Sequence, residues 1–192
     1  MHWCSYFFYC ELSKIKDIYI VEHIFKLLII GDREVGRRTF LREARDCFFN
    51  EGRIDIIGVE AYKKELTVEE SVFNFMIWNV SNKEIFRHYL RTFISGSNAA
   101  ILMFDITNLK SFDYLSEFPK MVREYAGDIP IHLVGNKIDL EEDRVVSRDQ
   151  ANTFARINDL LGYIEISAKN EKDWGAIFKL LAEQILTQLQ LH

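Results

Sequence analysis

The sequence predicts an α/β fold in which a mostly parallel, six-stranded sheet carries helices on both faces. Short apolar runs alternate along the chain with stretches whose apolar residues recur at helical spacing, which is typical of this class. Two of the runs, Phe25–Ile30 and Ala99–Ile106, are almost continuously apolar, as buried parallel strands are. The loops of unusual composition follow strands, at the sheet edge where such folds bind ligands.

Apolar periodicity also gives the expected elements. The expected strands are Phe25–Ile30, Ile57–Leu66, Ser71–Asn79, Ala99–Ile106, Ile131–Val134 and Tyr163–Ile166. The short connection between the second and third strands predicts an antiparallel hairpin. The expected helices are Thr39–Phe48, Lys83–Phe93, Ser111–Tyr125, a helix from Ser147 to about Leu160, and a last helix with an apolar stripe from Trp174 to Ile185. Pro119 should kink the third helix, and Ser147 and Gln150 form a capping-box pattern.

Composition restricts the classes of function. A chain of 192 residues, 48% hydrophobic and 28% charged, is most simply one globular domain. Its net charge of −5 argues against general nucleic-acid binding, because no excess of Lys and Arg is present to neutralise phosphates. Cys4, Cys10 and Cys47 form no metal spacing and no set of pairs, so we expect a reduced, cytoplasmic protein. No apolar run approaches the roughly 20 residues that span a bilayer.

The two ends of the chain are expected to lie outside the domain. Residues 1–24 form an aromatic-rich extension of unknown role, which we expect to pack on the domain as an additional helix or strand. A segment that touches membranes through acylation of Cys4 or Cys10 is the alternative, and it would give peripheral membrane association. Residues 189–192 form a short tail without a cysteine, so we expect no prenyl anchor.

One turn between a strand and a helix has the pattern of a phosphate-binding loop. The stretch from Ile30 to Thr39 reads IGDREVGRRT, with glycines at positions 31 and 36. Such glycines let backbone N–H groups point at an anion, and the following helix N-terminus adds partial positive charge. The pattern requires Lys and then Ser or Thr after the second glycine, whereas this chain has Arg37 and Arg38. The chemistry of the loop is therefore altered at two positions.

Two later loops have the residues of a guanine site. Gly135-Asn136-Lys137-Ile138-Asp139 follows one strand, and Ser167-Ala168-Lys169 follows the last. A carboxylate held at Asp139 can accept two N–H groups of a guanine ring, while Asn136 and Lys137 brace the loop. The nearby run Glu141-Glu142-Asp143-Arg144 is interpreted as a solvated loop.

With these motifs in order, the chain resembles the small GTPases of the Ras superfamily. The Rab-like branch is closest, from Ile57-Gly58-Val59-Glu60, Trp78, and Phe104 to Asn108 with Ser111-Phe112. The resemblance covers residues 25–188, which we take as a P-loop NTPase-like small G domain. It implies GTP or GDP as ligand, and Phe49 as an aromatic ring against the base. The implied nucleotide-binding residues are Gly31, Asp32, Arg33, Glu34, Val35, Gly36, Arg37, Arg38, Thr39, Phe49, Asn136, Lys137, Asp139, Ser167, Ala168 and Lys169.

The sequence departs from the family pattern at the positions that bind phosphate and Mg²⁺. Arg37 replaces the Lys that bridges the phosphates, and Arg38 replaces the hydroxyl residue that ligates Mg²⁺. The other departures are Ile56 for the first-switch Thr, Asn79 and Asn82 for the Asp and Gly of the second switch, Lys83 for the Gln that orients water, and Arg33 beside the γ-phosphate. No catalytic residue is then intact and no metal ligand remains, so we expect little or no Mg²⁺-dependent hydrolysis.

Three functions stay open at this point. The first is a guanine-nucleotide-binding protein with impaired hydrolysis, whose arginines replace the Lys and Mg²⁺ charges. The second is an active GTPase that uses non-standard residues or a partner's groups, and the third is a scaffold without nucleotide, because bulky arginines fill the pocket. In each case we expect a monomer that contacts protein effectors or regulators through Ile54–Val59 and Lys83–Phe93, and no nucleic acid.

Overall fold

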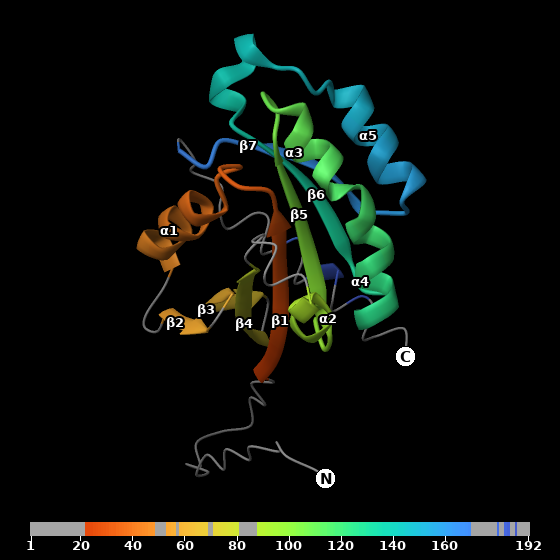
Figure 1. The fold of residues 1–192 in the computed structure, drawn as a ribbon. Coiled ribbons are helices and arrows are strands. Elements are labelled where there is room, and N and C mark those ends of the chain that lie inside the picture. Colours follow the sequence, from red (N-terminus) through yellow and green to blue (C-terminus); the bar gives the residue numbers. More distant parts are fainter. Residues whose placement is uncertain are drawn as a thin grey trace, which may run out of the picture.

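The computed structural model describes residues 22–48, 53–56, 58–68, 71–80 and 88–169, together with residues 180, 183, 184 and 187. Its strands form one sheet in the order β2-β3-β4-β1-β5-β6-β7 (Figure 1). The strands are β1 (Glu22–Gly31), β2 (Arg53–Ile56), β3 (Val59–Val68), β4 (Ser71–Val80), β5 (Ala99–Asp105), β6 (Ile131–Asn136) and β7 (Gly162–Ile166). The α-helices are α1 (Arg37–Phe48), α2 (Leu90–Ile94), α3 (Leu109–Asp113), α4 (Phe118–Ala126) and α5 (Arg148–Ile157), and the 3₁₀ turns are η2 (Tyr114–Glu117) and η3 (Ile138–Asp143).

The strand pairing confirms the predicted fold class. Strand β1 lies parallel to β4 and β5, and β6 lies parallel to β5 and β7. The predicted hairpin is also present, because β3 and β4 are antiparallel with Val68 opposite Ser71. All six predicted strands are found, and β2 joins β3 as a short additional edge strand. Four residues are too few for the period-2 pattern that reveals a strand in a sequence.

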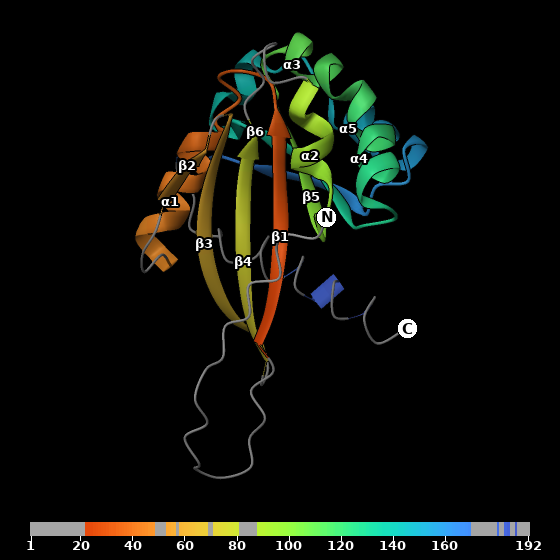
Figure 2. The same cartoon turned by 60° about the horizontal axis from the view of Figure 1, so that its bottom comes forward.

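The sheet separates two apolar cores. Leu27 and Ile29 of β1 point to the core that contains Phe40 of α1, whereas Leu28 and Ile30 point to the other core. That second core is closed by residues of α2, α4 and α5 (Figures 1 and 2). Because side chains alternate between faces and both faces are covered, the central strands must be apolar throughout.

Several helix boundaries differ from the expected ones for local reasons. The predicted helix Ser111–Tyr125 is divided into α3, η2 and α4, and Pro119 lies in the first turn of α4, where its missing N–H costs no hydrogen bond. The Ser147 cap of α5 is confirmed, with reciprocal hydrogen bonds to Gln150. Helix α2 begins at Leu90, and residues 83–87 of the predicted helix lie outside the described part. Most of the predicted last helix also lies outside it.

Strand β1 is longer than expected. It begins at Glu22, three residues before the predicted start, and pairs with β4 from that residue onward. Residues 22–24 thus belong to the sheet, while 1–21 lie outside the described residues. The carboxyl end of β1 leads into α1. Because β1, β5, β6 and β7 are parallel, their carboxyl ends lie at the same edge of the sheet (Figure 1).

Candidate nucleotide-binding site

The turn between β1 and α1 is shaped by two glycines. A Cβ atom on Gly31 would lie 2.4 Å from the carbonyl oxygen of Met103, so the neighbouring strand leaves no room for a side chain. Gly36 has a φ of +98°, and a Cβ there would lie 2.2 Å from Nδ2 of Asn136. The first helical hydrogen bond follows at once, from Phe40 N to Gly36 O at 2.8 Å. The N-terminus of α1 therefore faces the loop with N–H groups that have no acceptor within the helix, and no acidic residue lies in its first turn.

Asn136 joins this turn to the two guanine-type loops. It is fully buried at the end of β6. Its Nδ2 donates to the carbonyl oxygen of Val35 at 2.7 Å, and its Oδ1 accepts from the backbone N of Ala168 at 2.8 Å. One side chain thereby fixes three loops that are far apart in the sequence.

Asp139, the acidic residue of the loop after β6, is held in place by a hydrogen bond. Asp139 is exposed, and its Oδ1 accepts a hydrogen bond from Ser167 Oγ at 2.6 Å. Lys137 adopts a left-handed backbone with a φ of +70°, and its Nζ lies 2.6 Å from Oδ2 of Asp105. Asp105 also accepts from the N and Oγ1 of Thr107. A carboxylate presented at a fixed place beside a braced loop can receive paired N–H donors of a base.

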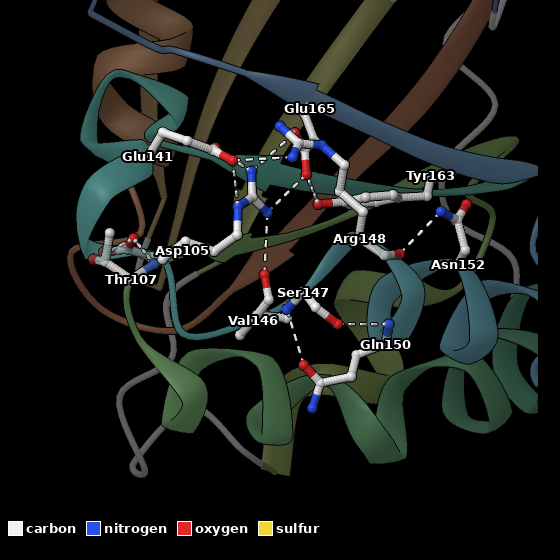
Figure 3. A network of polar contacts seen from close by, with 11 residues as sticks. Asp105, Thr107, Glu141, Val146, Ser147, Arg148, Gln150, Asn152, Tyr163 and Glu165 are labelled. Carbon is white, nitrogen blue, oxygen red and sulfur yellow. Dashed lines mark hydrogen bonds and ion pairs between the residues drawn. The ribbon is translucent and has the colours of Figure 1, made fainter.

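A second polar network connects the elements that carry the two guanine-type loops (Figure 3). The Arg144 guanidinium lies between Glu141 of η3 and Glu165 of β7, at 2.5 Å and 2.8 Å, and it also donates to the carbonyl oxygen of Val146. Burial opposes ionisation of Glu165, but hydrogen bonds from Arg144 and Tyr163 outweigh it and lower the pKa of the carboxyl. Hydrogen bonds to Glu141 raise the pKa of Arg144 above its usual range. The network thus ties η3, which carries Asp139, to β7, which leads to Ser167.

This network corrects the interpretation of residues 141–144 as a solvated loop at one position, Arg144, since Glu141, Glu142 and Asp143 are exposed. The Arg144 side chain is only 12% exposed. Arg148 of α5 adds a second bridge from its exposed side to both Glu141 and Glu165. The sequence contains the i,i+3 spacing of Glu141 and Arg144, but nothing in it indicates that Glu165, from the next strand, is the other partner.

The phosphate side of the site is occupied by contacts of the two arginines. The Arg37 guanidinium donates to the carbonyl oxygen of Val80 at the end of β4, and burial lowers its pKa to about 10. Arg38 lies beside Glu60 of β3, with Nη2 2.8 Å from Oε1. Asn79 of β4 donates from Nδ2 to Glu60 Oε2 at 2.8 Å. Arg38 thereby connects the first turn of α1 to β3, which follows residues 54–58, and Arg37 connects it to the end of β4.

The residues at this position do not fit the Mg²⁺ ion that the family pattern implies. A guanidinium offers no lone pair to a metal, and the Glu60 carboxylate is already paired with Arg38. The Asn79 amide carries no charge and directs its donor nitrogen at Glu60. Within the described ranges, no three His, Cys, Asp or Glu side chains form a group that could hold a metal ion.

The structure brings most of the predicted site residues to one edge and leaves a few outside. The turn from Gly31 to Thr39 lies beside Asn136 and Ala168, and Asp139 contacts Ser167, while Arg33 and Lys169 are exposed. Ile56 ends β2 opposite Val59. Phe49, Asn82 and Lys83 lie outside the described residues. Sequence reasoning did not assign a role to Glu60 or Val80, because their partners are distant in the chain.

This fold, with a phosphate-type loop and two guanine-type loops at one sheet edge, is that of a small GTP-binding protein. A sequence model of the Ras family matches residues 26–187. The chain belongs to the Ras family and is a Rab-like small GTPase homologue.

Curated relatives agree with this assignment. The chain is 32% identical over 166 residues to Ras-related protein Rab-1 of Theileria parva, covering 85% of this chain and 75% of the relative. It is 33% identical over 170 residues to Ras-related protein Rab-2B of Dictyostelium discoideum, covering 88% and 84%. Ras-related protein Rab-13 of Rattus norvegicus is 32% identical over 166 residues, covering 86% and 81%. In the part of the chain that is described, no helix has the length and apolar character needed to cross a bilayer.

Proposed function

We propose that this chain binds guanine nucleotide through an intact base-binding half, without a bound Mg²⁺ ion, and that its GTP hydrolysis is impaired or absent. The observation that carries the proposal is the contrast between the two halves of the site. The loops around Asn136 and Asp139 are fully braced, whereas Arg38 and Glu60 form an ion pair at the position where the family pattern has the metal.

Base recognition is supported by the position of Asp139. Its exposed carboxylate accepts a hydrogen bond from Ser167, and Ala168 N donates to Asn136. Each charge-assisted hydrogen bond to a guanine N–H contributes about 1.5–3 kcal/mol. Adenine lacks the paired donors, so two such bonds give a strong preference for guanine.

Phosphate binding is supported by backbone groups and by Arg37. The turn after β1 presents the N-terminus of α1, and Arg37 keeps its charge at neutral pH, since its pKa of about 10 lies well above 7. Arg38 is balanced by Glu60 in this conformation, so three free arginine charges are not available until that pair opens. The phosphates are therefore held by fewer charges than a Lys and Mg²⁺ supply, and we expect moderate affinity.

Hydrolysis requires groups that this half lacks. Phosphoryl transfer depends on positioned charge and positioned water. Asn79 stands where the family pattern has an acid, and Lys83 stands where it has Gln. We propose that the chain then acts as an interaction module, which presents residues 54–59 and 83–93 to protein effectors or regulators.

A nucleotide-free scaffold is the second candidate. It is favoured by the contacts of Arg37 with Val80 and of Arg38 with Glu60, which satisfy both guanidinium groups with protein acceptors. Extraction of nucleotide from the purified protein separates the candidates. Bound GTP or GDP that survives EDTA treatment supports the proposal, and protein that is empty and does not take up added GDP supports the scaffold.

Single-turnover hydrolysis tests the remaining possibility, that the chain is an active GTPase. Release of phosphate from bound GTP at the rate of an ordinary small GTPase, with or without Mg²⁺, would contradict impaired hydrolysis. We expect GTP to remain intact over the same period. A parallel measurement on a small GTPase that carries the Lys, Thr and Gln of the family pattern controls for the assay.

A further inference from the structure

We infer that the Lys26 side chain is a site of N-acylation, at which acyl thioesters transfer their acyl group to the amine. The site lies away from the nucleotide-type loops, which follow the carboxyl ends of the strands. Lys26 belongs to β1, and the next residue, Leu27, pairs with Ala99 at the amino end of β5. The inference does not depend on the proposed function. It follows from the way in which three elements hold one amine that has no acidic partner.

Lys26 is fixed at a junction of β1, β4 and the turn between α2 and β5. Its backbone N–H donates to Asn98 Oδ1 at 2.9 Å, and its carbonyl oxygen accepts from Asn98 N at 2.8 Å. Its Nζ donates to the carbonyl oxygen of Ser95 at 2.8 Å and lies 4.1 Å from the centroid of the Trp78 ring. Lys26 is half-buried, whereas Ser95 and Asn98 are exposed, so a reagent can approach the amine past this turn.

The amine lacks the carboxylate that commonly accompanies a lysine away from full solvent exposure. Its side-chain contacts are a neutral carbonyl and an aromatic ring, and no Asp or Glu of the described ranges forms an ion pair with it. Burial lowers the pKa of Lys26 to about 8. The Trp78 ring attracts the charged form, which offsets only part of this shift.

An amine in this state is a nucleophile near neutral pH, because only the uncharged form has a lone pair that can attack a carbonyl carbon. At a pKa of about 8, about 10% of the amine is uncharged at pH 7, against under about 0.1% at the ordinary value of 10.5. Lys26 therefore offers far more reactive amine than an exposed lysine does.

The acylated product fits the same position. The uncharged Nζ attacks the carbonyl carbon of the thioester, the C–S bond breaks, and the sulfur leaves as a thiol with the proton that the amine loses. The resulting amide keeps one N–H, which can still donate to the carbonyl oxygen of Ser95, and its acyl group can lie on the apolar face of Trp78. Acylation therefore removes a charge that burial disfavours and retains the hydrogen bond.

The test treats the full-length protein with acetyl-coenzyme A at about pH 7.5 and follows each lysine by mass spectrometry of its peptides. We expect Lys26 to be acetylated at least about fivefold faster than the exposed Lys110 and Lys120. Its rate should level off between about pH 8 and 9, whereas the rates of the two control lysines should keep rising. Acetylation of Lys26 at the rate of the controls, or more slowly, would overturn the inference.

Denaturation separates the effect of the fold from that of the local sequence. In concentrated urea the junction is lost, so Lys26, Lys110 and Lys120 should react at about the same rate. A lead of Lys26 that persists in urea would show that its sequence neighbours activate it, and this too would overturn the inference.

Thermal unfolding gives an independent readout. The folded protein binds the Lys26 proton less readily than the unfolded chain does, so the Lys26 amine should make the Tm rise between about pH 8 and 9.5. Lys26→Met keeps the apolar stem without the amine and should reduce this rise, and protein acetylated at Lys26 should behave in the same way. Equal pH dependence in unmodified and acetylated protein would contradict the inference, whether or not Lys26→Met folds.

Discussion

Single residues in this site act mainly through geometry that the backbone fixes. Gly36 combines a left-handed backbone with close contact to Asn136, and Asn136 in turn joins Val35 to Ala168. The sequence predicted these residues from their motifs. It could not predict that Arg38 pairs with Glu60, because the two lie on different elements and no local pattern connects them.

The first prediction concerns the base-reading carboxylate. Asp139→Asn replaces one acceptor oxygen with a donor, so the variant should bind GDP at least about tenfold more weakly and should gain affinity for xanthosine diphosphate. Titration with both nucleotides measures the change. Asp143→Asn, at an exposed acid of the same 3₁₀ turn, is the matched control and should keep the affinity for GDP. Equal loss in the two variants would show that general charge, rather than base contact, matters.

The second prediction concerns the shape of the phosphate-type loop. Gly36→Ala should lower the free energy of unfolding by about 2–3 kcal/mol, because the methyl group is both strained at φ +98° and driven into Asn136 Nδ2. Gly96→Ala has a φ of +71° but nothing within 4 Å of the added Cβ, so it should show only the smaller backbone cost. Urea denaturation of the two variants compares them. Similar losses would mean that the contact with Asn136 relaxes freely.

At the scale of elements, the apolar pattern was sufficient to find strands and most helices. Continuous runs marked β1 and β5, and the Ser147 cap marked the start of α5. The pattern failed where an element is short, as in β2, and where charged residues form a packed network, as between η3 and β7. Composition alone predicts that a run of charged residues is a solvated loop, because it does not reveal an ion-pair partner on another strand.

The third prediction tests that network. Arg144→Ala should cost about 1–2 kcal/mol of stability, because the mostly buried Glu165 loses its buried cation and keeps only the exposed Arg148. Arg148→Ala removes a bridge from the exposed side and should cost much less. Thermal unfolding of both variants provides the comparison. We also expect Arg144→Ala to weaken guanosine binding, because η3 carries Asp139 and β7 leads to Ser167. Unchanged guanosine binding would show that the network stabilises the fold without positioning the base site.

The fourth prediction concerns pH and the buried His132 of β6. Its Nε2 lies 2.8 Å from Gln184 Oε1, and burial lowers its pKa below the usual 6.5. The unfolded chain therefore binds a proton more readily than the folded one, so folding stability should fall as pH decreases below about 6.5. His132→Asn should flatten this slope between pH 7 and 5 in denaturant titrations. An unchanged slope would assign the acid sensitivity to other groups.

At the scale of the whole molecule, the fold brings the loops of a nucleotide-type site to one edge of the sheet. The Ras-family architecture places the turn after β1 and the loops after β6 and β7 together. Asn136 braces the loops of the base half, whereas Arg37 and Arg38 contact Val80 and Glu60 in the phosphate half. Sequence motifs predicted an intact base half and an altered phosphate half, whereas the contacts of Arg37 with Val80 and of Arg38 with Glu60 are visible only in the structure.

The most direct test of the account is a titration of the nucleotide-free protein with GDP and with ADP in excess EDTA, repeated with Mg²⁺. We predict that GDP binds, that ADP binds far more weakly, and that Mg²⁺ changes neither dissociation constant by more than about twofold. Binding of GDP that requires Mg²⁺, or equal binding of GDP and ADP, would contradict it.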